Sequence, residues 1–410
     1  MLIDIFIGAG DTVTTPTRSM LRALEHASLG DDVFNESATT TKLEQRVASL
    51  FGKPSSLFVL SGTMGNLLAL RAHLQQPPHS VLCDARSHLQ NFEAGGIASL
   101  SQAMTVPVRP SNGLYLTLAD VEANAILPTH AVLDIHCCLT RVIELENTVS
   151  GVVMPLEHVR EICGFARRHG IKVHLDGARL WNACDDVAAL REYAAEVDSL
   201  SVCFSKSLGA PVGSFVVGEE ALVRHARHTK KMVGGGVRQA GVLTAMAEVA
   251  LDEVYLSGRL KVANTYATRL ADKWRSLGGL LTLPCDTNML WLDLKSRGVS
   301  EEDWAKATRN EGVAVVGARV VFHYRGCAKR TFSLTPLHPL RVNTLADGIL
   351  FRKLERSGRT VGEGNGRGLQ RGGREESRWQ GKRHRFYRGQ GIINSKRQEG
   401  SGASLFITPV

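Results

Sequence analysis

Residues 171–179 read Ile-Lys-Val-His-Leu-Asp-Gly-Ala-Arg, and residues 205–211 read Ser-Lys-Ser-Leu-Gly-Ala-Pro. The first segment is a β-like run that ends on the carboxylate of Asp176. The second follows the short apolar stretch 199–204 and puts Lys206 in a turn that contains glycine. Open α/β sheets bind their ligands at the carboxyl ends of the strands. We therefore expect Asp176 and Lys206 to serve one site at such an edge.

This pair matches the requirements of pyridoxal 5'-phosphate (PLP) chemistry. A lysine amine can form a Schiff base with the aldehyde, and a carboxylate can pair with the pyridine nitrogen. Each residue also has a simpler interpretation, because Lys206 could be a surface-loop lysine and Asp176 a helix N-cap. Together they favour an enzyme of amino-acid metabolism.

Four further features support this hypothesis. Gly62 and Thr63 lie at the start of a helix-like run (61–74) that follows a strand-like run (57–60). Backbone N–H groups and a hydroxyl there could bind a phosphate or simply cap the helix. His88 could stack on a flat ring, act as a general base, or be structural. Basic side chains supply the other two features. Arg179 could bind the cofactor through a ring oxygen or bind a substrate carboxylate, and Arg319 could bind a substrate carboxylate. Lys231 and Arg238, which flank Gly234-Gly235-Gly236, could reach a phosphate of the same or of a neighbouring subunit.

The middle of the chain alternates short apolar strands with amphipathic helices, which predicts an α/β fold with a mostly parallel sheet covered on both faces. The predicted strands are 57–60, 80–83, 130–134, 141–145, 171–175 and 199–204, with later strands at 287–294, 314–316 and 320–323. A long helical segment is expected over about 239–276. We predict a large domain at 10–255, a small α+β domain at 256–350, altered after 325, and a tail at 351–410.

Composition is that of a soluble globular protein, with 43% hydrophobic and 22% charged residues and no apolar run long enough to cross a bilayer. The N-terminus is a poor signal peptide, so we expect a cytoplasmic protein. Eight cysteines without a Cys-x-x-Cys pair indicate reduced thiols and no metal site. Residues 351–400 hold 14 Lys/Arg against 5 Asp/Glu, so this segment carries the whole net charge of +9.

The chain resembles the threonine aldolase family of PLP enzymes, which have the aspartate-aminotransferase-like fold (fold type I). The matching motifs, in family order, are Asp11-Thr12-Val13-Thr14 with Pro16-Thr17, Gly30-Asp31-Asp32-Val33, Ser61-Gly62-Thr63-Met64-Gly65-Asn66, Glu93-Ala94-Gly95-Gly96, Leu145-Glu146-Asn147-Thr148, His174 to Arg179, Ser205-Lys206 with Gly209-Ala210-Pro211, Gly234-Gly235-Gly236 with Arg238-Gln239, and Thr287-Asn288-Met289. They span about residues 9–325.

The resemblance implies a low-specificity L-threonine/L-allo-threonine aldolase, an aldehyde-lyase that releases glycine and acetaldehyde. It implies that Lys206 binds the cofactor covalently, that Asp176 pairs with the ring nitrogen and that His88 stacks on the ring. It implies the remaining roles as well: Gly62 and Thr63 hold the phosphate, with Lys231 and Arg238 of a neighbouring subunit, while Arg179 and Arg319 fix the substrate carboxylate. A homodimer or homotetramer with shared active sites is expected, and nucleic acid is not an expected partner.

Five positions depart from the family pattern: Gly10, Phe34, Asn35, Leu67 and Val149. Gly10 replaces a serine expected near the substrate carboxylate, and Val149 stands where many members have histidine. The proton acceptor for the β-hydroxyl is then His88 or a water. The alternative function is therefore an amino-acid (alanine) racemase of a fungal peptide pathway on the same scaffold.

A third hypothesis is an inactive or truncated family member, because the sequence after 325 no longer follows the family. The Arg/Gly-rich tail could bind RNA through its charge. The simpler interpretation is disordered sequence that arises from intron read-through or a frameshift, and we favour it.

Overall fold

The computed structural model describes residues 10–128, 134–310, 313, 315 and 317–325. Its main sheet has the strand order β1-β7-β6-β5-β4-β2-β3. These strands are β1 (Ser55–Val59), β2 (Ser80–Asp84), β3 (Met104–Val108), β4 (Thr140–Glu146), β5 (Lys172–Asp176), β6 (Ser199–Cys203) and β7 (Ser214–Gly218). Neighbours from β3 to β6 are parallel, and β7 is antiparallel to both β6 and β1. The predicted mostly parallel α/β sheet is confirmed.

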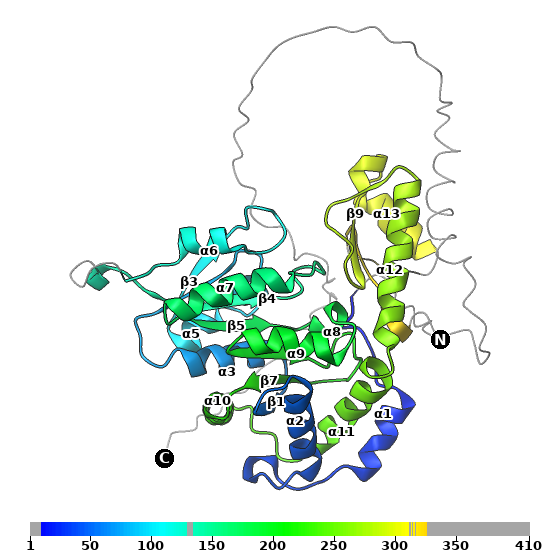
Figure 1. The fold of residues 1–410 in the computed structure, drawn as a ribbon. Helices are drawn as coiled ribbons and strands as arrows, with labels where there is room; N and C mark the ends of the chain where they lie inside the picture. The colour runs from blue at the N-terminus through cyan, green and yellow to red at the C-terminus, as the bar shows by residue number, and fades with distance from the viewer. Residues whose placement is uncertain (1–9, 129–133, 311–312, 314, 316, 326–410) are drawn as a thin grey trace, which may run out of the picture. The chain divides into compact units, whose positions relative to one another are not determined.

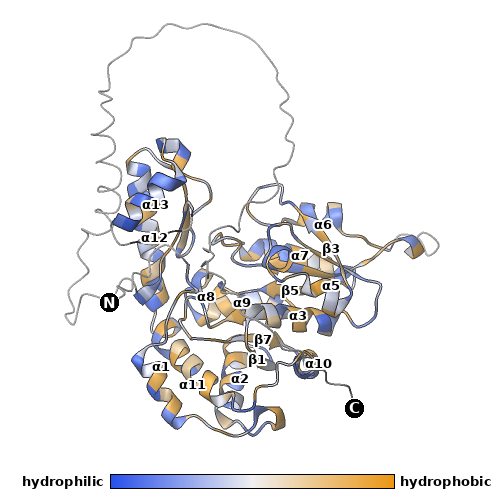
Figure 2. Ribbon diagram, turned by 180° about the vertical axis from the view of Figure 1, so that it is seen from behind, coloured by the Kyte–Doolittle hydropathy of each residue, from blue (hydrophilic) through white to orange (hydrophobic). Residues whose placement is uncertain are grey.

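Helices cover both faces of this sheet (Figure 1). The α-helices that the structure describes, including two that pack on a second sheet, are α1 (Arg18–Ala23), α2 (Ala38–Leu50), α3 (Gly62–His73), α4 (His88–Asn91), α5 (Gly96–Ser101), α6 (Leu118–Asn124), α7 (Leu156–Arg168), α8 (Leu180–Ala183), α9 (Val187–Glu196), α10 (Glu220–Met232), α11 (Gly241–Ala250), α12 (Arg259–Ser276) and α13 (Glu301–Asn310). Apolar residues of α3, α5 and α10 share clusters with β1, β2 and β7, whereas those of α7 and α9 pack on the other face. Most helices carry both hydrophobic and hydrophilic residues (Figure 2), as one buried and one solvent-facing side require.

The sheet face beneath α3 is polar at its centre. Because side chains alternate along a strand, Val173 and Leu175 of β5 enter the main core while His174 and Asp176 face the opposite way, toward α3. The register pairs His174 with Glu144 of β4. A parallel sheet covered on both faces is usually apolar on both. This polar band is where the predicted site residues gather.

A second, antiparallel sheet has the order β10-β9-β8, formed by β8 (Leu280–Leu281), β9 (Met289–Asp293) and β10 (Arg319–Val321). It packs on α12 and α13 around its own apolar cluster, which includes Trp274 and Trp304. The strands predicted at 287–294 and 320–323 are confirmed, but 314–316 is only partly described. The domain boundary at 255/256 stays a prediction, and the tail lies outside the described residues.

The long helical segment expected over about 239–276 is present as α11, a π-helical turn at Leu251–Tyr255 and α12, with Gly258 at φ +74° just before α12. Other parts of the secondary structure were not predicted. The strands β3 and β7 were not predicted. For the strand expected at 130–134, residues 130–133 are not described, and Asp134 begins a short 3-10 helix.

Two expectations drawn from composition can be compared with the described part of the chain. The seven described cysteines are free thiols, as predicted, and Cys327 falls outside. Among the helices that the structure describes, none is both long and apolar enough to span a bilayer.

Candidate active site

The predicted site residues meet where three neighbouring parallel strands end. Glu146 and Asp176 are the last residues of β4 and β5 and are paired in register, and Lys206 follows β6 by three residues. Lys206 is half-buried and lies close enough to Glu146, His88 and Asp11 for its charge to act on each of them. The expected placement of Lys206 and Asp176 at one edge of the sheet is confirmed.

Asp176 is held rigidly and is only 2% exposed. Its Oδ2 accepts a hydrogen bond of 2.8 Å from Asn66 Nδ2, and its Oδ1 accepts one of 2.9 Å from the backbone N–H of Ala178. The alternative interpretation as a helix N-cap is wrong, because the N-cap of α8 is Arg179. A buried carboxylate with two fixed donors keeps a defined orientation toward a partner.

His88 begins α4 beside this carboxylate. Its backbone N–H donates to Glu146 Oε2 (2.8 Å), and its Nδ1 lies 2.9 Å from Glu93 Oε1. The hydrogen bond to Glu93 raises the pKa of His88, although burial opposes this. Asn66 Nδ2 also donates to Glu93 Oε1 (2.9 Å), so one amide joins the carboxyl partner of His88 to Asp176. Asn66, Glu93 and Glu146 were not predicted as site residues.

Arg179 forms an ion pair with Asp11, a partner that was not predicted. Its Nε and Nη2 donate to the two oxygens of Asp11 at 2.8 and 2.9 Å, and Ser207 donates to the same carboxylate at 3.0 Å. Burial alone would lower the pKa of Arg179, but the charge and hydrogen bonds of Asp11 outweigh it and raise the pKa. This pairing occupies one edge of the guanidinium and leaves Nη1 for a ligand.

Arg319 of β10 lies next to this pair. A Cβ atom placed on Gly10 would lie 3.9 Å from Arg319 Nη2, and burial together with the charge of Arg179 lowers the pKa of Arg319. The structure therefore brings Arg179 and Arg319 together around one carboxylate, Asp11. Two guanidinium groups near one carboxylate suit the binding of a substrate carboxylate.

The start of α3 packs directly against the strand that leads to Lys206. A Cβ atom on Gly62 would lie 2.8 Å from Cys203 Sγ, so only glycine permits this approach. Ser61 caps the helix by accepting from the Met64 N–H at 3.1 Å. Gly62 and Thr63 thus place the first N–H groups of a twelve-residue helix beside the Lys206 turn, where they suit an anion.

Lys231 and Arg238 are exposed at the end of α10 and just beyond it. Arg238 pairs with Asp31 at 2.7 Å, and its guanidinium lies 5.8 Å from the ring centre of Phe34. Among the described residues, neither cation forms a hydrogen bond or ion pair with Gly62 or Thr63 of the same chain. The structure does not bring them into the site, and their contribution from a neighbouring subunit stays a prediction.

Three carboxylates, one of them that of Asp176, lie close together on the polar face of the sheet. One oxygen each from Glu144, Glu146 and Asp176 lies within 4.8 Å of the others. Glu144 is fully buried, and neither of its oxygens has a hydrogen-bond partner in the described chain. Burial, with the neighbouring negative charges, raises the pKa of Glu144 well above its usual range and that of Glu146 to about 7. We therefore expect Glu144 to be protonated in the folded protein.

This assignment predicts how Glu144→Gln changes stability with pH. A carboxyl with a raised folded-state pKa stabilises fully below its unfolded pKa, near 4.5, and loses that contribution as the pH rises. Glutamine keeps the neutral shape at every pH. The variant should therefore match the original chain at pH 4 and have an unfolding free energy higher by at least about 1 kcal/mol at pH 8.

Urea unfolding at the two pH values measures this difference, with the exposed Glu122→Gln as a matched control. Equal destabilisation of Glu144→Gln at both pH values would contradict a protonated Glu144.

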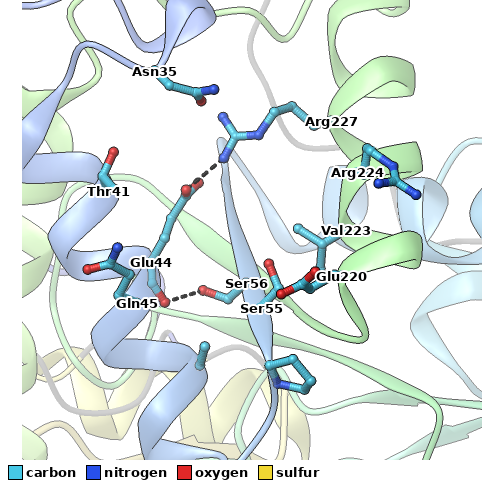
Figure 3. Close-up of a pocket in the computed structure, with 12 residues that line it drawn as sticks. Asn35, Thr41, Glu44, Gln45, Ser55, Ser56, Glu220, Val223, Arg224 and Arg227 are labelled. Carbon is cyan, nitrogen blue, oxygen red and sulfur yellow. Dashed lines mark hydrogen bonds and ion pairs between the residues drawn. The ribbon is translucent and has the colours of Figure 1, made fainter.

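A cavity of about 330 Å³ lies elsewhere, between α2, α10 and the edge strand β1 (Figure 3). None of the predicted site residues lines it. Its wall includes Glu44, which accepts from Arg227 at 2.7 Å and from the Phe58 N–H at 2.8 Å. Because the charges of Glu44 and Arg227 neutralise each other, we assign no role to this cavity.

The residues at the sheet edge match the functional groups of PLP, which are its aldehyde, ring nitrogen, ring face and phosphate. Lys206 offers an amine, Asp176 a buried carboxylate, His88 an imidazole, and the start of α3 a set of N–H groups. This edge, on a sheet of this order, fits the PLP-dependent enzymes of fold type I, and the family match makes the protein a PLP-dependent lyase. The model of the beta-eliminating lyase family matches residues 9–297, and the chain belongs to that family.

Several known proteins are similar over most of the chain. Aldolase vrtJ of Penicillium aethiopicum is 50% identical over 77% of this chain and 80% of its own length. A low-specificity L-threonine aldolase of Candida albicans is 45% identical over 77% and 84%, and the alanine racemase TOXG of Cochliobolus carbonum is 40% identical over 77% and 82%. A putative L-allo-threonine aldolase of Listeria monocytogenes shares the fold, with a TM-score of 0.66, 22% identity and coverage of 82% and 92%.

Proposed function

We propose that the chain is a PLP-dependent aldolase that cleaves L-threonine and L-allo-threonine to glycine and acetaldehyde. The observation that carries this proposal is the convergence of Lys206, buried Asp176 and the Arg179–Arg319 pair at one sheet edge, in a chain 45% identical to a low-specificity L-threonine aldolase. These groups supply an amine, a counter-charge and a carboxylate clamp. An enzyme that breaks a bond at Cα of a small amino acid requires all three.

Bound PLP would supply an electron sink for the bond that breaks at Cα. Lys206 would hold it through its amine, and the fixed carboxylate of Asp176 would pair with the ring nitrogen. Gly62 and Thr63 would hold the phosphate through the N–H groups at the start of α3. Arg179 and Arg319 clamp the substrate carboxylate and so decide which bond at Cα is aligned for cleavage.

Cleavage of the Cα–Cβ bond requires a group that accepts the proton of the substrate's β-hydroxyl, and His88 is the candidate. The imidazole is anchored by Glu93 at Nδ1, which leaves Nε2 as the ring atom that can accept a proton directly or through a water. Val149 is only 4% exposed and has no titratable group, so it cannot fill this role. We assign the acceptor to His88 or a water that it holds.

Alanine racemisation is the second candidate. It is favoured by the 40% identity to the racemase TOXG and by Gly10, which carries no hydroxyl beside Arg319. A racemase would align the Cα–H bond where an aldolase aligns Cα–Cβ. Both reactions use the same Lys206 and Asp176.

We further propose a cytoplasmic homodimer or homotetramer with active sites shared between subunits. Phe34 is 68% exposed and lies three residues after Asp31, the ion-pair partner of Arg238. Met232 is 67% exposed and directly follows Lys231 at the end of α10. An interface there would bury these apolar side chains and bring both cations to a neighbouring phosphate.

The first test is release of glycine and acetaldehyde by the purified full chain with added PLP. We expect turnover of both L-threonine and L-allo-threonine, and the faster isomer gives the stereochemical preference. L-Alanine is the parallel substrate, followed by loss of optical rotation. A folded, PLP-loaded chain that racemises alanine and releases no acetaldehyde would replace the aldolase with the racemase, and one that does neither would be an inactive family member.

A further inference from the structure

A continuous line of hydrogen bonds runs through the polar band of the sheet and ends on Asp176. His73 Nε2 at the end of α3 lies 2.8 Å from Ser199 Oγ, which lies 2.8 Å from His174 Nδ1. His174 Nε2 lies 3.1 Å from Asn66 Oδ1, and Asn66 Nδ2 donates to Asp176 Oδ2 at 2.8 Å. Ser199 and His174 are fully buried, and Asn66 is 1% exposed.

The chemistry of Asn66 determines the direction of every bond in this line. Its Nδ2 faces two carboxylate oxygens, those of Glu93 and Asp176, so the NH₂ group must be on that side. Its Oδ1 then faces Ser201 Oγ and His174 Nε2, and both must donate to it. All four hydrogen bonds that an asparagine side chain can form are made.

The tautomer of His174 follows from this orientation. Because Nε2 carries the hydrogen, Nδ1 of a neutral ring must accept from the Ser199 hydroxyl, and the Ser199 oxygen in turn accepts from His73 Nε2. Only a doubly protonated ring could donate from both nitrogens. Burial, chiefly, lowers the pKa of His174 to about 3 and that of His73 to about 4, so both rings are neutral at physiological pH.

We propose that His73, Ser199, His174 and Asn66 form a one-directional chain of donors that positions the carboxylate of Asp176 for the cofactor nitrogen. The proposal rests on the role assigned to Asp176 above. Each donor in such a chain polarises the next, and the last one acts on the charged oxygen. All four are positioning residues, because none of them needs to touch the substrate.

The tautomer of His174 tests the chain without any activity measurement. The full chain, labelled with ¹⁵N-histidine, would be studied by NMR with and without PLP, and His174→Asn would assign the resonance. We expect a protonated Nε2, an unprotonated Nδ1 and no titration of the ring between about pH 5.5 and 8.5. A protonated Nδ1, or a ring that titrates in this range, would overturn the proposal even if the enzyme cleaves threonine.

Ser199→Ala tests the function of the chain, since it breaks the line without touching Asp176. Asn66→Ala removes the last donor, and Ser56→Ala is the matched control, a buried serine in β1 of the same sheet that donates to the Glu44 carbonyl. The loss should be about 10- to 100-fold in kcat for Asn66→Ala and about 3- to 10-fold for Ser199→Ala, with KM changed less than about threefold. Ser56→Ala should leave kcat unchanged.

The pH titration of the absorption of PLP bound at Lys206 separates positioning from simple stability. The midpoint of this titration should shift in Ser199→Ala and Asn66→Ala and remain unchanged in Ser56→Ala. A Ser199→Ala titration identical to that of the original chain would overturn the proposal, even if Asn66→Ala fails to fold. If the original chain releases no acetaldehyde, the proposed activity fails, but the tautomer and the titration still decide this inference.

Discussion

Lys206→Ala should reduce threonine cleavage at least about a thousandfold, because no other described residue supplies an amine at the carboxyl ends of β4, β5 and β6. Alanine removes both the covalent attachment and the positive charge that acts on Glu146, His88 and Asp11. Binding of PLP through the other contacts should persist in weaker form. The measurements are acetaldehyde release at saturating PLP and the absorption band of lysine-bound PLP, which should disappear.

The matched control is Lys172→Ala. Lys172 lies at the opposite end of β5 from Asp176 and pairs at the surface with Asp198 at 2.7 Å. An exposed pair of this kind contributes little to stability, so both turnover and the absorption band should be retained. Turnover by Lys206→Ala equal to that of the control would remove Lys206 from the mechanism and with it the proposed function.

The strands that carry the site could be predicted because their signals are local. Apolar runs before Asp176 and Lys206 became β5 and β6, and β1, β2 and β4 were found in the same way. The strand β7 was missed because it directly follows a glycine-containing turn and reverses direction. The strand β3 was missed because it contains Pro107 and has an exposed Met104 at the sheet edge, which weakens its apolar pattern.

The supporting residues of the site could not be predicted because their partners are distant in the sequence. Asn66 and Asp176 are 110 positions apart, and Asp11 and Arg179 are 168 apart. Only the strand order and the crossing of α3 over β5 and β6 bring them together. One local signal was present, since Glu144 and Glu146 alternate within an apolar strand, as His174 and Asp176 do. Two polar residues on one face of adjacent buried strands indicate a functional band.

The second large effect is expected at Asp176. Asp176→Asn keeps the size of the side chain but removes the negative charge, and we expect kcat to fall about 100- to 1,000-fold, as when one preorganised charge-stabilising group is lost. The fixed donors make the change more severe. Asn66 Nδ2 and the Ala178 N–H both donate to this carboxyl, and an amide has an oxygen for only one of them.

One buried donor is therefore left without an acceptor, which should also destabilise the fold by about 1–3 kcal/mol. The exposed Asp272→Asn is the matched control and should change neither quantity. An unchanged kcat in Asp176→Asn would show that the charge of Asp176 does not matter for the reaction.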